Sequence, residues 1–125
     1  MARRRLPGPA EQETLAGPPL LILTSLASGP KHGHMLMKDI DRFAMVRLGP
    51  GTLYGAISRL EQRGLIAPLP VGERRRPYEL TPRGATVLGA SIAQLGRVVH
   101  EGESRLRLLG RRRPLLGPAI AGDAG

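Results

Sequence analysis

The feature that most constrains this chain is a regular apolar repeat in its last third. Apolar or small residues recur at steps of four and three, at Leu88, Ile92, Leu95, Val99, Gly102, Leu106 and Leu109. This spacing predicts a long helix with a heptad seam along one side. The helix would be roughly 40 Å long, and a small helical head cannot bury such a seam. We therefore expect its six large residues to form a dimerisation surface, most simply with a second copy of the chain.

The overall charge favours a polyanionic partner. The 125 residues include 19 Lys and Arg against 10 Asp and Glu, so the formal net charge is +9. An excess of this size favours binding to nucleic acid or to an anionic membrane surface. No apolar run reaches the roughly 18 residues that a membrane-spanning helix needs, so we expect no membrane partner. The length indicates a single domain.

Composition and spacing argue against several kinds of chemical site. The chain has no Cys, which excludes disulfides, thiol catalysis and thiolate-bound metals, and agrees with a cytoplasmic location. His32 and His34 have no carboxylate pair at ligand spacing, so we expect no metal site. No catalytic triad or glycine-rich phosphate loop can be recognised. We expect no enzymatic activity and no cofactor, and the sequence does not identify a small-molecule effector.

The order of local signals predicts a mainly α-helical fold with a small β-hairpin. Gly-Pro and Pro-Gly pairs separate the apolar helical patterns, and Thr81-Pro82 is a typical helix start. The expected elements are helices over 18–28, 33–43 and 50–64, a hairpin within 65–80 and a long helix over 82–109. Residues 15–81 would then form a winged helix-turn-helix, residues 82–109 a C-terminal dimerisation helix, and residues 1–14 and 110–125 disordered tails.

The third expected helix has one face that needs no burial. Its core side is apolar, whereas the opposite side carries the predicted DNA contacts Thr52, Tyr54, Ser58, Arg59 and Gln62. The hydroxyls of Thr52 and Tyr54 would meet phosphates. Ser58, Arg59 and Gln62 could read base edges, where Arg pairs with guanine and Gln with adenine. Alternatives stay open: Thr52 as the cap of the helix, Tyr54 as a cover of the core, and Ser58, Arg59 and Gln62 as parts of a solvated face.

The hairpin carries three consecutive arginines near its tip, Arg74, Arg75 and Arg76. A tight turn projects such side chains beyond the body of the domain, where they can reach phosphates or the minor groove. We therefore predict that they bind DNA, although charge runs are also common on surfaces that bind nothing.

Three segments resemble the PadR family of transcriptional regulators. They are LLIL at 20–23 with GPKHG at 29–33, LGPGTLYGAISRLEQRGLI at 48–66 and ERRRPYELTPRG at 73–84. The resemblance covers roughly residues 18–109 and looks like the shorter kind of member, with a single helix after the hairpin. It implies a bacterial, cytoplasmic homodimer that binds double-stranded operator DNA, usually as a repressor. A two-fold dimer would read an inverted repeat.

Two other functions are compatible with the same residues. A winged helix can act as an adaptor that binds protein, in which case the positive charge is incidental. It can also act as a nucleoid-type protein that binds any duplex, without a ratio of specific to nonspecific affinity. Binding to duplex with sequence preference separates both from a regulator.

Overall fold

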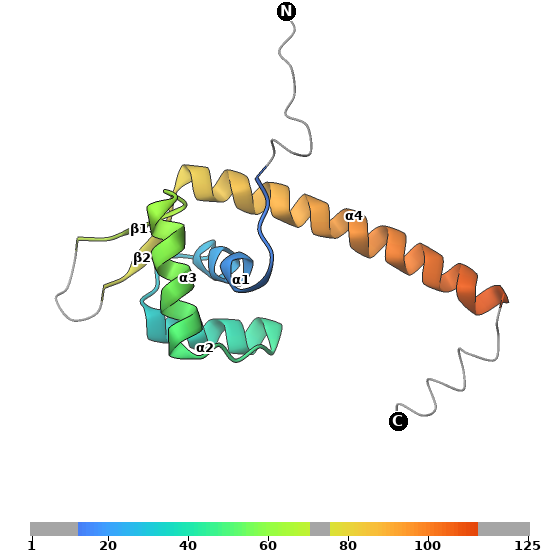
Figure 1. Ribbon diagram of the computed structural model, residues 1–125, viewed down its shortest axis with the longest axis horizontal. Coiled ribbons are helices and arrows are strands. Elements are labelled where there is room, and N and C mark those ends of the chain that lie inside the picture. The colour runs from blue at the N-terminus through green and yellow to red at the C-terminus, as the bar shows by residue number, and fades with distance from the viewer. Residues whose placement is uncertain (1–12, 71–75, 113–125) are drawn as a thin grey trace, which may run out of the picture. The chain divides into compact units, whose positions relative to one another are not determined.

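The computed structural model describes residues 13–70 and 76–112. Its elements are the helices α1 (Gly17–Leu26), α2 (Gly33–Ala44) and α3 (Pro50–Gln62), the strands β1 (Ile66–Pro68) and β2 (Tyr78–Leu80), and the helix α4 (Pro82–Arg112) (Figure 1). This order confirms the mainly α-helical winged helix-turn-helix with a small hairpin and a long last helix. The chain divides into two compact units between Ile92 and Ala93, within α4.

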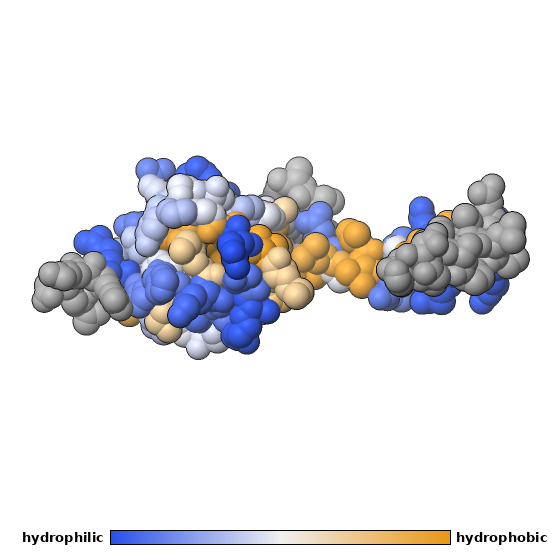
Figure 2. Space-filling view, turned by 90° about the horizontal axis from the view of Figure 1, so that it is seen from below, coloured by the Kyte–Doolittle hydropathy of each residue, from blue (hydrophilic) through white to orange (hydrophobic). Residues whose placement is uncertain are grey.

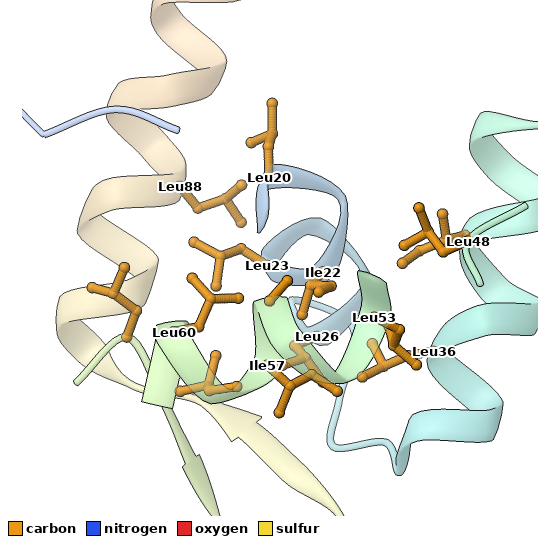
Figure 3. Close-up of a cluster of buried hydrophobic side chains, with 14 of the residues drawn as sticks. Leu20, Ile22, Leu23, Leu26, Leu36, Leu48, Leu53, Ile57, Leu60 and Leu88 are labelled. Carbon is orange, nitrogen blue, oxygen red and sulfur yellow. The ribbon is translucent and has the colours of Figure 1, made fainter. Parts of the chain in front are cut away.

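The core of the first unit is built around α1. Because this helix contacts α2, α3 and β2, it is apolar on nearly all sides, and Ile22 and Leu23 have no exposed surface. Figure 3 shows leucine and isoleucine side chains of α3, with Leu88 of α4, gathered about it. Each such side chain contributes about 1.5–3 kcal/mol when fully buried. This first unit, called the head below, comprises the described residues up to Ile92. It therefore includes the first turns of α4 and extends beyond the expected boundary at residue 81.

A glycine ends α3 and sets the direction of the chain toward the hairpin. Gly64 has a φ of +75°, a conformation that L side chains rarely adopt. The Gly64 N–H donates to the Glu61 carbonyl (3.0 Å) and the Leu65 N–H to the Leu60 carbonyl (3.0 Å). These two bonds form a Schellman motif, which satisfies carbonyls at the helix end. The end that the sequence predicts at Gly64 is thereby confirmed.

Thr81 connects the end of α3 to the start of α4. Its Oγ1 accepts a hydrogen bond from the Gly84 N–H (3.0 Å) and donates one to the Gly64 carbonyl (2.7 Å). Thr81 is therefore the N-cap of α4, as its position before Pro82 predicts. Gly84 lies directly against the Leu65 carbonyl, so a Cβ atom at residue 84 would collide with this backbone oxygen.

The hairpin is short and is attached to the turn between α1 and α2. β1 and β2 pair antiparallel, with Ile66 opposite Leu80 and Pro68 opposite Tyr78. Lys31 adds a third backbone segment: its N–H donates to the Tyr78 carbonyl (3.1 Å) and its carbonyl accepts from the Tyr78 N–H (2.9 Å). The hairpin is the wing of the winged helix, and its base is therefore held by the helical part of the head.

Parts of both expected tails are ordered in the structure. Glu13 forms ion pairs with Arg63 and with Arg83 (3.2 Å), and the Leu15 N–H donates to Ser91 Oγ (2.9 Å). These contacts fix residues 13 and 15 against the head, because each has a partner far along the chain. At the other end α4 continues to Arg112, past the predicted residue 109. Residues 1–12 and 113–125 lie outside the described part of the chain.

A polar network joins α1 to α2 at the edge of the core. Ser25 Oγ donates to Asp39 Oδ2 (2.6 Å), and the Arg42 guanidinium pairs with Oδ1 of the same carboxylate. The Ser25 hydrogen bond, helped by Arg42 and Lys31, lowers the pKa of Asp39 below its ordinary value of 3.8, although partial burial acts in the opposite direction. The network therefore stabilises the charged carboxylate in the folded head.

Replacing Ser25 with Ala is expected to lower the free energy of unfolding at about pH 6 and much less at about pH 2.5. Because the folded-state pKa of Asp39 is lowered, its contribution is present above pH 3.8 and is lost as the pH falls through the folded-state value. Urea titrations across this range measure the difference. Ser91→Ala is the matched control, since Ser91 is also buried but its hydroxyl contacts backbone groups. A pH-independent cost for both variants would contradict the prediction.

Candidate nucleic-acid interface

The outer face of α3 is polar and exposed to solvent. Its buried side consists of Leu53, Ala56, Ile57 and Leu60, as the helical pattern predicts. The opposite side brings together every DNA contact predicted on this helix, and all of them are exposed: Thr52, Tyr54, Ser58, Arg59 and Gln62. A helix anchored on one side and polar on the other can enter a DNA groove without disturbing the core.

The structure resolves the alternatives for the two residues at the start of α3. The N-cap is Gly49, which has no side chain, so Thr52 does not cap the helix and its hydroxyl lies in the exposed first turn. Tyr54 is 51% exposed, yet its ring and hydroxyl occupy the space that a Cβ at Gly33 would fill. Tyr54 therefore covers the start of α2 while about half of its surface stays exposed.

Arg59 lies on the middle of the exposed face. Its guanidinium runs back along the helix, with one nitrogen 3.7 Å from the position of a Cβ on Gly55. Because the neighbouring residues Gly55 and Ser58 are small, the Arg59 guanidinium has space to extend away from the helix. Gln62 is the last residue of α3 and is also exposed.

The wing contributes one cation within the described residues. Arg76 is exposed two residues before the start of β2, whereas Arg74 and Arg75 lie outside the part of the chain that the structure describes. Burial raises the pKa of the nearby Tyr78 hydroxyl, with Glu61 adding to this effect and Arg76 opposing it. Arg76 and Glu61, near the end of α3, are therefore both close enough to the Tyr78 phenol to affect its pKa.

The sequence matches the family model described as "Transcriptional regulator PadR-like family" over residues 22–90. A transcriptional regulator of Mycobacterium tuberculosis is 35% identical over 91 residues, covering 68% of this chain and 84% of that protein. This chain belongs to the PadR-like family.

Another relative of this PadR-like protein is an uncharacterised 37.1 kDa transposon protein of Streptomyces fradiae, 42% identical over 79 residues. That match covers 63% of this chain, which spans only 23% of the relative. Among solved structures, a PadR family regulator of Clostridium difficile has a TM-score of 0.62 at 24% identity, covering 71% of this chain and 96% of the other. A PadR-like regulator of Bacillus cereus has a TM-score of 0.63 at 20% identity, covering 70% and 89%. At these identities the two structures support the fold.

The predicted seam of the PadR-like protein divides into a covered start and an open remainder. Leu88 is buried in the core of the head, beside Leu20 and Leu23 in Figure 3. The five later residues are between 43% and 67% exposed: Ile92, Leu95, Val99, Leu106 and Leu109. Leu88 therefore already has an intramolecular partner, and the uncovered part of the seam begins at Ile92.

The described residues contain neither a candidate membrane-spanning helix nor a candidate metal cluster. No helix among them combines the length and apolarity needed to cross a bilayer. Within the same residues, no three side chains of the His, Asp and Glu types come together in a way that could hold a metal ion. His32 and His34 instead stack, with their ring centroids 6.4 Å apart.

The exposed side of α2 carries basic side chains that the sequence analysis did not assign to DNA binding. Lys38, His34 and Arg42 are exposed on this helix and line an open groove. The available signal was the i, i+4 spacing of His34, Lys38 and Arg42, which places all three on one side of a helix. Sequence alone assigns such a side to solvent, because it does not show what lies next to it.

Proposed function

We propose that this PadR-like protein is a cytoplasmic homodimeric repressor that binds an inverted-repeat operator in double-stranded DNA. The observation that carries the proposal is the exposed polar face of α3 on a helix whose other side is locked into the core. Ser58, Arg59 and Gln62 would read base edges, while Thr52 and Tyr54 contact phosphates. Arg74, Arg75 and Arg76 would reach the flanking backbone from the wing.

The open seam of α4 supports the dimeric part of the proposal. Five large apolar side chains at heptad spacing are exposed in a single chain, and this arrangement is typical of helices that pair with a copy of themselves. A two-fold pair of heads would present its α3 helices about 34 Å apart, one DNA turn, or a multiple of it. The operator is therefore expected to be an inverted repeat.

Selection of bound sequences from a random duplex pool at about 150 mM salt tests the proposal. An inverted repeat with half-sites about one DNA turn apart is the expected result. A single half-site without symmetry would contradict the dimer or its docking. Duplex binding without sequence preference would favour a nucleoid-type protein, and no duplex binding would favour an adaptor. Placing the selected site over a reporter promoter then shows whether binding represses transcription.

Arg59 and the wing arginines are expected to contribute differently to binding. Arg59→Ala should cost about 1–3 kcal/mol on the operator and much less on scrambled duplex, because it removes a base contact. Changing Arg74, Arg75 and Arg76 together to Ala should weaken both duplexes equally. It should also flatten the salt dependence by up to about 0.9 per lost phosphate contact.

Titrations of both variants on both duplexes at several salt concentrations separate the two roles. Arg107→Ala is the matched control, since it removes one exposed cation from α4 and should change little. An equal loss on both duplexes for Arg59→Ala would make it a backbone contact. An unchanged salt dependence for the wing variant would remove the wing from the interface.

A further inference from the structure

We propose that residues 13–16 hold α4 at the point where this helix leaves the head, and thereby set the half-site spacing that the proposed dimer accepts. These four residues are called the strap below. The inference rests on the proposed function, because spacing has a meaning only for a dimer on two half-sites. In this role Glu13 is a positioning residue, which acts on DNA recognition without touching DNA.

Two ion pairs attach the start of the strap to two different helices. The Glu13 carboxylate pairs with Arg63, the residue after the end of α3, and with Arg83 in the first turn of α4 (3.2 Å). Its Oε2 atom faces Arg63 and is shielded from solvent. An isolated surface pair contributes little, but one partly buried carboxylate that serves two guanidinium groups is a firmer attachment. Glu13 therefore joins the end of α3 to the start of α4.

The strap meets α4 a second time at Ser91. The Leu15 N–H donates to Ser91 Oγ (2.9 Å), and the Leu15 side chain packs against the core of the head. Figure 1 shows the strap crossing α4 before the chain enters α1. Ser91 is the last buried residue of α4, and the head ends one residue later, at Ile92. The strap therefore contacts α4 where the helix leaves the head.

The turn of α4 that the strap contacts has features that favour bending. Gly89 lowers the helix propensity of this turn, and a Cβ there would meet nothing within 4 Å. Ser91 Oγ donates to the Val87 carbonyl (2.7 Å), and such bonds from residue i to residue i−4 often bend helices. Kinks are also common where glycine and serine lie close together. Without the strap, the head would pivot on α4 at this turn.

A small pivot is enough to change the half-site spacing. From Ser91 back to Pro82 the helix rises about 14 Å, and Thr81 there contacts the end of α3. A rotation of roughly 14° about Ser91 would move this junction by about 3.4 Å, the rise of one base pair. Beyond Ser91 the apolar seam is exposed, as the orange surface on this part of α4 shows in Figure 2, and a partner helix would hold only that part. The strap keeps the head in register with it.

The test measures operator affinity as a function of half-site spacing for wild-type protein and for Glu13→Ala. The duplexes carry the selected half-sites at the selected spacing, and with one or two base pairs added or removed. Wild-type protein should lose about tenfold or more at the altered spacings, because each half-site is displaced and turned about the duplex axis. Glu13→Ala should bind the selected spacing within about threefold of wild type, and lose no more than about threefold when one base pair is added or removed.

A matched control and a rescue variant accompany this measurement. Glu101→Ala also removes one carboxylate with an arginine partner, Arg105, and changes the net charge equally, so it should keep the sharp dependence on spacing. Gly89→Ala added to Glu13→Ala should restore much of that dependence, because alanine stiffens the turn that the strap supports. Thermal melting identifies any loss of folding, and Glu13→Gln replaces Glu13→Ala if the latter unfolds.

A measurement without DNA separates positioning from stability. The chain contains no Cys, so Lys38→Cys provides a single labelling site on the exposed surface of α2. The distance between nitroxide labels on the two chains of the dimer, measured by double electron–electron resonance, should be narrowly distributed with the native strap. It should be broadly distributed with Glu13→Ala. Equally narrow distributions would mean that the strap does not hold the head in place, and would overturn the proposal.

The spacing series can also contradict the proposal in two ways. One is a dependence on spacing that is identical in Glu13→Ala and wild-type protein. The other is an equal loss of affinity at every spacing, which would show that the strap only stabilises the head. Both results leave operator selection intact, whereas wild-type protein that selects no paired half-sites overturns the proposed function itself.

Discussion

Replacing Leu95 and Val99 together with Asp is expected to convert the proposed dimer into monomers and to abolish binding to the proposed operator at concentrations where wild-type protein binds. Both side chains are about half exposed in a single chain, so the change should not disturb the head. In the dimer they would lie in the seam, where an unpaired carboxylate loses its hydration and meets a second one from the partner. Light scattering gives the mass, and titration of the operator gives the affinity.

Leu108→Asp provides the control for this experiment. Leu108 is also about half exposed on α4, but it lies outside the heptad positions of the seam. This variant should remain dimeric and bind the operator normally. A dimer mass that persists in the Leu95/Val99 variant would show that another surface joins the two chains.

Replacing Gly84 with Ala is expected to destabilise the head by about 3 kcal/mol, near the upper end for overpacking substitutions. The added Cβ would meet the Leu65 carbonyl, a backbone atom that cannot move without disturbing the end of α3. The clash would separate the start of α4 from that junction and strain the cap made by Thr81. Urea or thermal unfolding of the purified variant measures the loss.

Gly89→Ala is a matched substitution in the same helix. A Cβ there meets nothing within 4 Å, so the change should stabilise α4 by up to about 1 kcal/mol through helix propensity. Opposite signs for the two variants are the expected result. Similar effects at both positions would mean that propensity, and not the close approach to Leu65, determines the outcome.

The elements of this fold could be predicted from the sequence because their boundaries depend on local chemistry. Thr81 caps α4 and Gly64 ends α3 through hydrogen bonds to residues within a few positions, and such signals are visible in any short window. The polar face of α3 could be predicted for a similar reason, since one helical period separates it from the buried side.

What sequence reasoning missed depends on contacts between distant residues. Leu88 fits the same spacing as Leu95, yet only the fold shows that α1 already covers Leu88. The local sequence around Gly33 does not indicate that Tyr54 lies over it, and the sequence around Glu13 does not indicate its ion pair with Arg83. Periodicity identifies the apolar side of a helix, but what packs against that side is decided by tertiary structure.

The backbone pairing between Lys31 and Tyr78 has a consequence for the thermodynamics of DNA recognition. Ordering one residue costs about 1–2 kcal/mol in conformational entropy, and a free hairpin would lose that entropy when it met DNA. Here Lys31 and Tyr78 exchange two hydrogen bonds in the free protein, so the base of the wing is ordered during folding. Binding to DNA therefore does not carry the entropic cost of ordering these residues, and the free energy of association is more favourable by that amount. The strength of DNA binding therefore depends partly on a contact in the α1–α2 turn, made by backbone atoms before any duplex arrives.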